Sequence, residues 1–161
     1  MNIYDTIIIG AGASGLMLAS ILKQNKIALV DHNSKIGQKI KISGGGRCNI
    51  TNAKINVCNY DGNKEFIKSI LDRFNNKELL KFLDKNHLDY TIRDEQYYFC
   101  KRSADDIIDV FRKNIKHCEL FLNTKVTNII KNNLFIVESN DKKLKAKNIV
   151  IATGGLSYVS V

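Results

Sequence analysis

The stretch Gly10-Ala11-Gly12-Ala13-Ser14-Gly15 decides the fold of this 161-residue chain. It has the spacing G-x-G-x-x-G and follows an apolar, β-branched run from Ile3 to Ile9. Residues Ala13 to Gln24 repeat apolar side chains at helical spacing, and a second apolar run, Ile27 to Val30, comes after them. A buried strand, a glycine turn, a helix and another strand within about 30 residues predict one βαβ unit.

Each glycine of this turn has a physical reason in a dinucleotide site. Gly10 allows a tight turn, Gly12 lets backbone N–H groups approach a pyrophosphate, and Gly15 lets helix and strand pack closely. Unpaired N–H groups and the helix dipole favour a phosphate at the start of the helix. Asp31 ends the second strand, where its carboxylate is predicted to accept hydrogen bonds from ribose hydroxyls and to disfavour NADP. The motif alone fits FAD or NAD, and the plain alternative is a tight turn followed by a solvated acid.

A long polar loop from Gly37 to Asn52 is the second candidate functional segment. Its three successive glycines, Gly44 to Gly46, offer backbone N–H groups and little bulk to a flat or anionic ligand. The alternative is a flexible glycine loop that binds no ligand. Such a loop would not require the dense run of polar residues that is found here. Those polar residues are Lys39, Arg47, Asn49, Thr51 and Asn52.

Two segments carry a family resemblance. Ser43 to Asn52 reads Ser-Gly-Gly-Gly-Arg-Cys-Asn-Ile-Thr-Asn, and Ala152 to Tyr158 reads Ala-Thr-Gly-Gly-Leu-Ser-Tyr. With these segments and the opening glycine turn in this order, the chain resembles the BaiN-like, or aminoacetone-oxidase-like, bacterial FAD-dependent oxidoreductases. The resemblance implies an α/β fold, a Rossmann-like FAD/NAD(P)-binding domain of the two-dinucleotide-binding flavoprotein type, to which the residue pattern adds a small antiparallel β-meander.

The resemblance also implies FAD as the cofactor and assigns residues to it. Gly10 to Gly15 would hold the pyrophosphate and Asp31 the adenosine ribose. The loop from Gly44 to Asn52 would pass near the flavin. Val126 would contact adenine through its backbone, and Ala152 to Gly154 would close over the cofactor. The expected cofactor-binding residues are Gly10, Gly12, Ala13, Ser14, Gly15, Asp31, His32, Lys39, Gly45, Gly46, Arg47, Cys48, Asn49, Thr51, Val126, Ala152, Thr153 and Gly154.

The rest of the chain has recognisable local patterns, whereas residues 33 to 63 are predicted to be an extended loop. Apolar spacing predicts helices, and alternation between turn residues predicts strands, the last of them forming a small antiparallel meander. A capping box is expected at Ser103 and Asp106. The predicted helices are Glu65 to Phe74, Lys77 to Asn86 and Ser103 to about Lys116; the predicted strands are Tyr90 to Ile92, Gln96 to Phe99, Glu119 to Leu122, Lys125 to Ile130, Leu134 to Ser139, Lys142 to Lys147 and Asn148 to Ala152.

Composition narrows the function classes. The net charge of +9 permits binding of nucleic acid, but the lysines are scattered, and a solvated basic surface is the favoured interpretation. The uncharged stretch from Thr6 to Leu22 contains glycines and serines and falls short of the roughly 20 residues of a membrane span. No metal site is expected, since Cys48, Cys58, Cys100 and Cys118 have no metal-ligand spacing.

The cysteines are expected to be buried or idle thiols in a reducing cytoplasm. For Cys48, packing or backbone positioning is favoured over a redox thiol beside a basic residue. His32 and His87 are expected to be surface or loop residues rather than catalytic bases, and no catalytic residue is assigned.

The sequence therefore predicts the FAD-binding portion of an oxidoreductase that carries out two-electron chemistry on a small molecule, with NAD(P)H as a candidate reductant. Residues 1–161 are expected to form one FAD-binding domain, the N-terminal part of a longer flavoprotein, without its substrate domain and C-terminal FAD segment. This part is expected to be inactive alone. Val159 stands where the family continues with proline. The alternatives are a basic dinucleotide-fold module that binds nucleic acid, and an NAD-dependent dehydrogenase, which leaves the Gly44 to Asn52 loop unexplained.

Overall fold

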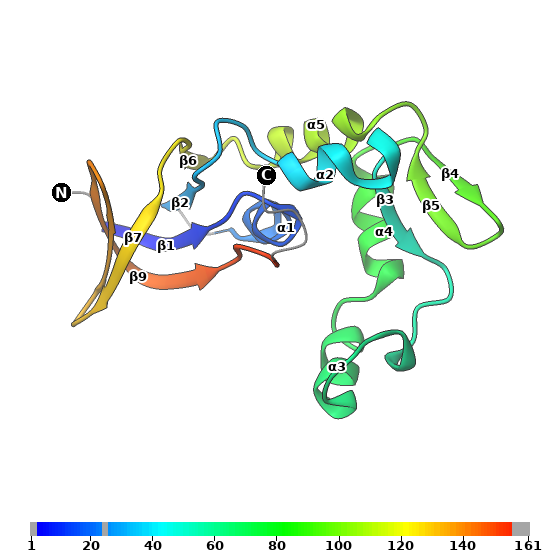
Figure 1. The fold of residues 1–161 in the computed structure, drawn as a ribbon, viewed down its shortest axis with the longest axis horizontal. Coiled ribbons are helices and arrows are strands. Elements are labelled where there is room, and N and C mark those ends of the chain that lie inside the picture. The colour runs from blue at the N-terminus through cyan, green and yellow to red at the C-terminus, as the bar shows by residue number, and fades with distance from the viewer. Residues whose placement is uncertain (1–2, 24–25, 156–161) are drawn as a thin grey trace. The chain divides into compact units, whose positions relative to one another are not determined.

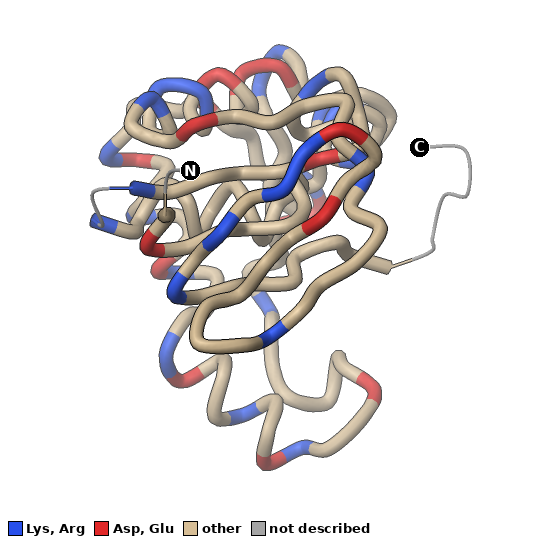
Figure 2. Tube along the Cα trace, turned by 90° about the vertical axis from the view of Figure 1, so that its left-hand side faces the viewer, with Lys and Arg blue, Asp and Glu red and all other residues tan. Residues whose placement is uncertain are grey.

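The computed structural model describes residues 3–23 and 26–155. The chain divides into two compact units, a subdivision that the sequence does not predict. One unit comprises Met1–Ile40 with Phe111–Val161, and the other comprises Lys41–Val110. Lys and Arg residues are spread over both units, with acidic residues among them (Figure 2).

The first unit is built on a six-stranded sheet, as far as the described residues show, with the order β6-β2-β1-β9-β8-β7. Strand β1 lies between β2 and β9 and is parallel to both, and β6 continues the parallel part beyond β2 (Figure 1). This is the arrangement expected of a Rossmann-like domain. The strands are β1 (Ile3–Ile9), β2 (Ile27–Val30), β6 (Cys118–Phe121), β7 (Val126–Lys131), β8 (Phe135–Ser139) and β9 (Lys143–Ile151).

Apolar side chains on both faces of β1 and β2 hold this sheet in the core. Ile7 and Val30 belong to a buried cluster that includes Val137 and Ala146 of the antiparallel strands. Ile8 is fully buried, and its side chain lies at the place where helix α1 (Ala13–Ile21) packs closely on β1 through Gly15. Burying an aliphatic side chain of this size stabilises a fold by about 1.5–3 kcal/mol, so β1 and β2 anchor the unit.

The predicted βαβ unit is confirmed, with one boundary corrected. Helix α1 ends at Ile21, because Leu22 has an extended backbone, whereas the periodicity predicts a helix as far as Gln24. Leu22 still donates its N–H to the carbonyl of Leu18 and so closes the last turn.

The predicted antiparallel meander is confirmed as β7, β8 and β9, but its last strand differs from expectation. The segments Lys142 to Lys147 and Asn148 to Ala152 were expected to be separate, and they form the single strand β9. Its first part pairs with β8, while the strand pairs with β1 from Lys145 to Ile151. The continuous pairing with β1 explains why no turn interrupts it.

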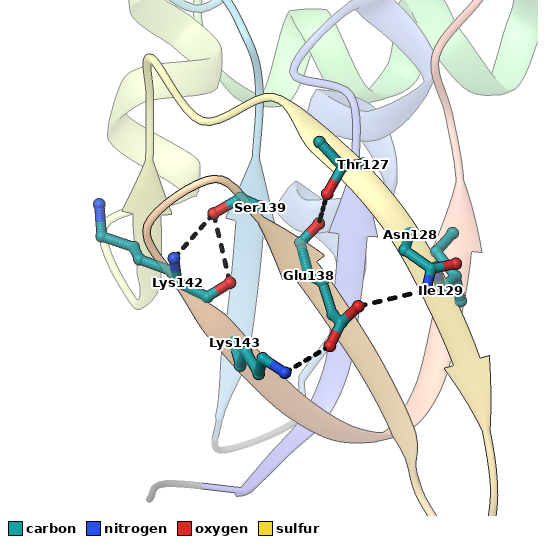
Figure 3. Close-up of polar contacts among 7 residues, drawn as sticks. All are labelled: Thr127, Asn128, Ile129, Glu138, Ser139, Lys142 and Lys143. Carbon is teal, nitrogen blue, oxygen red and sulfur yellow. Dashed lines mark hydrogen bonds and ion pairs between the residues drawn. The ribbon is translucent and has the colours of Figure 1, made fainter.

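Polar side chains cross the meander around Glu138 (Figure 3). The Glu138 carboxylate pairs with Lys143 Nζ at 2.7 Å and accepts a hydrogen bond from Asn128 Nδ2 at 3.2 Å. The hydrogen bond and charge of Lys143 hold the pKa of Glu138 below its usual value. These contacts join all three antiparallel strands on the solvent-exposed side.

The second unit contains a three-stranded antiparallel sheet, within the described residues, with the order β3-β5-β4. The expected hairpin is confirmed as β4 (Tyr90–Arg93) and β5 (Tyr97–Cys100), and its turn has Asp94 and Glu95 at φ 48° and 58°. The other elements around it are α2 (Gln38–Ile42), η1 (Ser43–Gly46), β3 (Asn49–Asn52), η2 (Val57–Asn59), α3 (Lys64–Leu71), α4 (Asn76–Lys85) and α5 (Ala104–Asn114), of which α2 and α5 run across the unit boundaries.

The prediction of an unbroken loop from residue 33 to 63 is wrong, because α2, two 3₁₀ turns and β3 lie within it. Strand β3 forms by pairing with β5, a long-range partner that local periodicity does not reveal. The predicted capping box at α5 is present, since the Ser103 hydroxyl accepts from Asp105 N–H and the Asp106 carboxylate accepts from Ser103 N–H. No helix in the described part of the chain is long and apolar enough to cross a membrane.

Candidate cofactor site

Three residues at the carboxyl ends of neighbouring parallel strands form the centre of the site. Ile9 is in register with Val30 of β2 and with Ile151 of β9, so Gly10, Asp31 and Ala152 follow at one level. Backbone hydrogen bonds join them to the strands, from Gly10 N–H to the Val30 carbonyl and from Ala152 N–H to the Ile9 carbonyl, both 2.7 Å. The carboxyl edge of a parallel sheet, where strand order reverses, is the usual position of a nucleotide site.

Gly10 and Gly15 are required by close packing. A Cβ atom on Gly15 would lie 1.9 Å from the Gly10 carbonyl oxygen, and one on Gly10 would lie 2.3 Å from the Ala152 carbonyl oxygen. Gly10 also has φ +111°, a backbone angle that residues other than glycine rarely adopt. These two glycines bring α1, β1 and β9 together, as the motif predicts.

Gly12 plays a different part, because a Cβ atom there would meet nothing within 4 Å. It is the N-cap of α1, and no side chain caps the helix at this position. The Gly12 carbonyl accepts a hydrogen bond of 2.9 Å from Leu16 N–H, which closes the first helical turn. Ala13 and Ser14, in that turn, are exposed. The N–H groups of a first helical turn have no partner inside the helix. The open space beside Gly12 therefore fits a pyrophosphate.

Asp31 is buried, with 9% of its surface exposed, and both carboxylate oxygens have partners. Oδ2 accepts a hydrogen bond from Ala11 N–H at 2.6 Å, and Oδ1 accepts one from Asn33 N–H at 2.8 Å. The exposed His32 ring lies 3.5 Å from Oδ1. A carboxylate has about four acceptor positions, so Asp31 retains capacity for a ribose hydroxyl while it fixes the glycine turn.

Ala11 and Gly37 support the glycine turn through their backbones, although neither is among the expected cofactor-binding residues. The Ala11 peptide is held on both sides, by Asp31 at its N–H and by Gly37 N–H at its carbonyl, the latter at 2.8 Å. Gly37 has φ +69°, which explains a glycine there. The sequence does indicate Gly37, because an isolated glycine at the start of the polar loop suggests a special backbone conformation.

The closing segment after β9 is exposed at Thr153 and Gly154. Lys39 reaches it, since its Nζ donates a hydrogen bond to the Gly155 carbonyl. The Leu156 to Tyr158 part of the expected motif lies outside the described residues. Val126, at the start of β7, is half-buried against the hydrophobic cluster of the first unit, and its expected contact with adenine stays a prediction.

The glycine loop in the second unit has a defined conformation. Gly44, Gly45 and Gly46 have φ +57°, +64° and +83°, and a Cβ atom on Gly45 or Gly46 would meet nothing within 4 Å. Cys48 N–H closes the loop on the Ser43 carbonyl at 3.0 Å. The loop thus presents exposed backbone, followed by the exposed side chains of Arg47 and Asn49, while Thr51 is half-buried in β3.

The predicted cofactor-binding residues thus fall into two sets, one in each unit. The first unit brings together the glycine turn, Asp31, His32, Lys39 and the segment Ala152 to Gly154, with Val126 on β7. The second unit contains Gly45 to Asn49 and Thr51. In the described part of the chain, no group of three or more His, Cys, Asp or Glu residues is placed to hold a metal ion.

The sheet order and the glycine turn define a Rossmann-like dinucleotide-binding domain. The family described as HI0933-like protein Rossmann domain matches residues 4–161, and this chain belongs to it. This membership confirms the resemblance drawn from the sequence motifs.

Relatives with assigned names extend the comparison. The chain is 34% identical to a ribosomal RNA dihydrouridine synthase of Escherichia coli and 32% identical to one of Haemophilus influenzae, with 98% and 95% of the chain aligned. It is 26% identical to a 3-dehydro-bile acid delta(4,6)-reductase of Clostridium scindens over 96% of the chain. The chain spans 41%, 41% and 40% of these relatives, about two fifths of their length.

Solved structures share the fold at lower identity. A flavocytochrome c3 fumarate reductase superposes with a TM-score of 0.62 at 19% identity, covering 96% of this chain and 34% of that one. THI4 of Thermovibrio ammonificans gives 0.61 at 16% identity, covering 94% and 57%. The family and the fold together support FAD as the cofactor.

Proposed function

We propose that this chain is the FAD-binding part of a flavin-dependent reductase, with the pyrophosphate at the N-terminus of α1 and the adenosine ribose at Asp31. The single observation that carries this proposal is the open space beside Gly12 at an uncapped helix start. When bound, FAD supplies two-electron transfer, and the protein supplies position and electrostatics.

The residues of this chain have positioning roles in that proposal. The N–H groups of Ala13 and Ser14 face the negative charge of the pyrophosphate at the helix start. Asp31 holds the turn through Ala11 and accepts from the ribose with its remaining lone pairs. The exposed backbone of Gly45 and Gly46 is a surface on which a flat ring can lie closely, because neither glycine has a side chain in the way.

The names of the relatives suggest a reaction class for the whole protein. Dihydrouridine differs from uridine by two hydrogens added across a carbon–carbon double bond, and a delta(4,6)-reductase is named for such bonds. In uracil and in a 3-oxo steroid these bonds are conjugated with a carbonyl. We therefore propose a two-electron reduction of a conjugated double bond, in which a hydride adds to the carbon remote from the carbonyl and a proton to the adjacent carbon, with NAD(P)H as the reductant.

Ligand titration of the full chain tests the FAD site. FAD should change its fluorescence and raise the unfolding temperature of the protein, and ADP should compete, since α1 and Asp31 face the adenosine diphosphate half. FMN, which lacks that half, should bind much more weakly. A folded protein that binds FMN as tightly as FAD, or binds neither, would overturn the proposed site.

A ribosomal RNA substrate is the second candidate, and it is favoured by the net charge of +9 together with the two relatives named as ribosomal RNA dihydrouridine synthases. Basic residues attract nucleic acid through release of counterions, which makes binding strongly salt-dependent. Fluorescence anisotropy should give tighter binding of a ribosomal RNA fragment than of duplex DNA of equal length, at equal salt. Equal or absent binding of both would leave the small-molecule substrate as the better hypothesis.

A further inference from the structure

Two cysteines distant in the sequence lie next to each other in the second unit. Strand β3 pairs with β5 so that Asn49 lies opposite Phe99, which places Cys48, the residue before β3, beside Cys100, the last residue of β5. A backbone hydrogen bond of 2.9 Å from Cys100 N–H to the Arg47 carbonyl confirms the approach. Both cysteines are free and buried, and their thiols are hydrogen-bonded to one another.

The positions suit a disulfide. Cys48 has φ +49° and lies between Arg47, whose carbonyl accepts from Cys100 N–H, and Asn49, which pairs with Phe99. This keeps it beside Cys100, as a disulfide requires, since its two Cα atoms lie about 4.4–6.8 Å apart. The other two cysteines differ, because Cys58 is exposed in η2 and Cys118 belongs to β6 of the other unit.

From this geometry we propose that Cys48 and Cys100 form a reversible dithiol–disulfide pair, with Cys48 as the sulfur that reacts first and Cys100 as the resolving sulfur. Cys48 retains 6% exposure while Cys100 has none, so only a small oxidant reaches the pair, and it reaches Cys48. Hydrogen peroxide is an oxidant of that size.

The pKa values agree with this division of roles. The hydrogen bond from Cys100 and a second from the Ser43 side chain lower the pKa of Cys48, against the opposing effect of burial. The pKa of Cys100 is raised by its hydrogen bond to Cys48 and by burial. Thiolate is the reactive form of cysteine, so Cys48 is the better nucleophile of the two.

The chemistry balances in two steps. The Cys48 thiolate attacks one oxygen of hydrogen peroxide, the O–O bond breaks, and sulfenic acid and hydroxide result, the hydroxide leaving as water after taking up a proton. The Cys100 sulfur then attacks Cys48 Sγ, the S–O bond breaks, and the departing hydroxide takes the Cys100 proton. Two thiols and one peroxide give one disulfide and two waters, and a thiol reductant reverses the change.

The disulfide would join the glycine loop to β5. Cys48 is at the end of that loop, where its N–H bonds to the Ser43 carbonyl, and Cys100 is in β5. Oxidation would therefore fix the loop without requiring a new fold. The inference does not depend on whether the chain binds FAD.

Peptide mapping of the full chain tests the pair directly. Tryptic digestion gives each cysteine its own peptide, so the four thiols are detected separately. The peptides are 48–54 for Cys48, 55–64 for Cys58, 94–101 for Cys100 and 117–125 for Cys118. Reduced protein treated with hydrogen peroxide should yield the peptides 48–54 and 94–101 linked, with a loss of two hydrogens, as the main product. Dithiothreitol should restore both thiols.

Variants distinguish the two roles. Cys100→Ser should leave Cys48 as a sulfenic acid that dimedone traps, whereas Cys48→Ser should leave Cys100 unmodified. The double variant Cys58→Ser with Cys118→Ser is the matched control and should still form the link. Wild-type protein that keeps both thiols under peroxide, or that links Cys48 or Cys100 to another cysteine instead, would overturn the proposal whether or not the variants fold.

Discussion

The Asp31 carboxylate accepts a hydrogen bond of 2.6 Å from the backbone N–H of Ala11, inside the glycine turn itself. The acid that marks the end of β2 therefore shapes the phosphate-binding turn. This bond is buried and joins two elements of the βαβ unit, so the ribose site and the pyrophosphate site share one support.

Replacing Asp31 by asparagine is expected to destabilise the first unit by about 2 kcal/mol, the usual cost of losing a hydrogen bond to a charged group. The amide can accept from Ala11 or from Asn33, but its NH₂ group then faces the other N–H donor. Thermal unfolding measures the loss. Asp72→Asn is the control, since it breaks only the exposed pair with Lys68, and a similar loss in both variants would contradict the assignment.

The substitution Gly15→Ala is expected to prevent close packing of α1 on β1. Its Cβ atom would lie 1.9 Å from the Gly10 carbonyl oxygen, which is backbone and cannot move aside as a side chain can. We expect a loss on the order of 3 kcal/mol or more in unfolding free energy, measured by denaturant titration. A variant as stable as the wild type would show that the packing of α1 on β1 is looser than described.

The glycine loop offers a second matched comparison. A Cβ atom on Gly44 would lie 2.7 Å from Asn49 N and 2.9 Å from the Phe99 ring, whereas one on Gly45 would meet nothing within 4 Å. Both residues have positive φ, so alanine at Gly45 should cost only about 1–2 kcal/mol of backbone strain. Gly44→Ala should cost more, as measured by thermal unfolding. The reverse order would contradict the loop conformation.

Tyr4 provides a pH prediction. Burial, with the hydrogen bond of 2.6 Å to Glu119 and the negative charge of that residue, raises the pKa of the Tyr4 phenol above its ordinary value. A raised folded-state pKa gives stability that is complete below the unfolded pKa of about 10 and is lost as pH rises above it. Unfolding free energy should therefore fall less between pH 9 and 11 in Tyr4→Phe than in the wild type. An unchanged slope, or the same change in the exposed Tyr60→Phe control, would count against this cause.

Local signals were sufficient to predict much of the fold and part of the site. The βαβ unit was predictable because apolar periodicity, glycine spacing and the strand-end acid all lie within the first 31 residues. The capping box at Ser103 and the hairpin before it were predictable for the same reason.

Features that depend on distant partners were not predictable in this way. Strand β3 exists because it pairs with β5, and the continuity of β9 follows from its pairing with β1. The contact of Cys48 with Cys100 has the same origin, since sequence spacing alone gave no reason to join them. The hydrogen bond from Ala11 N–H to Asp31 was not predictable, because every residue except proline has a backbone N–H and the residue type does not indicate the donor.

The FAD affinity of Gly12→Ala is the measurement that tests the central claim most directly. With φ −85° and no atom within 4 Å of the added Cβ, this variant should fold, losing at most about 1 kcal/mol because alanine is a poorer N-cap than glycine. Its methyl group would occupy space assigned to the pyrophosphate. We predict an FAD dissociation constant raised about tenfold or more, equivalent to about 1.4 kcal/mol or more, measured at a temperature where the ligand-free variant is fully folded. Equal affinity in variant and wild type would contradict a pyrophosphate site at the start of α1.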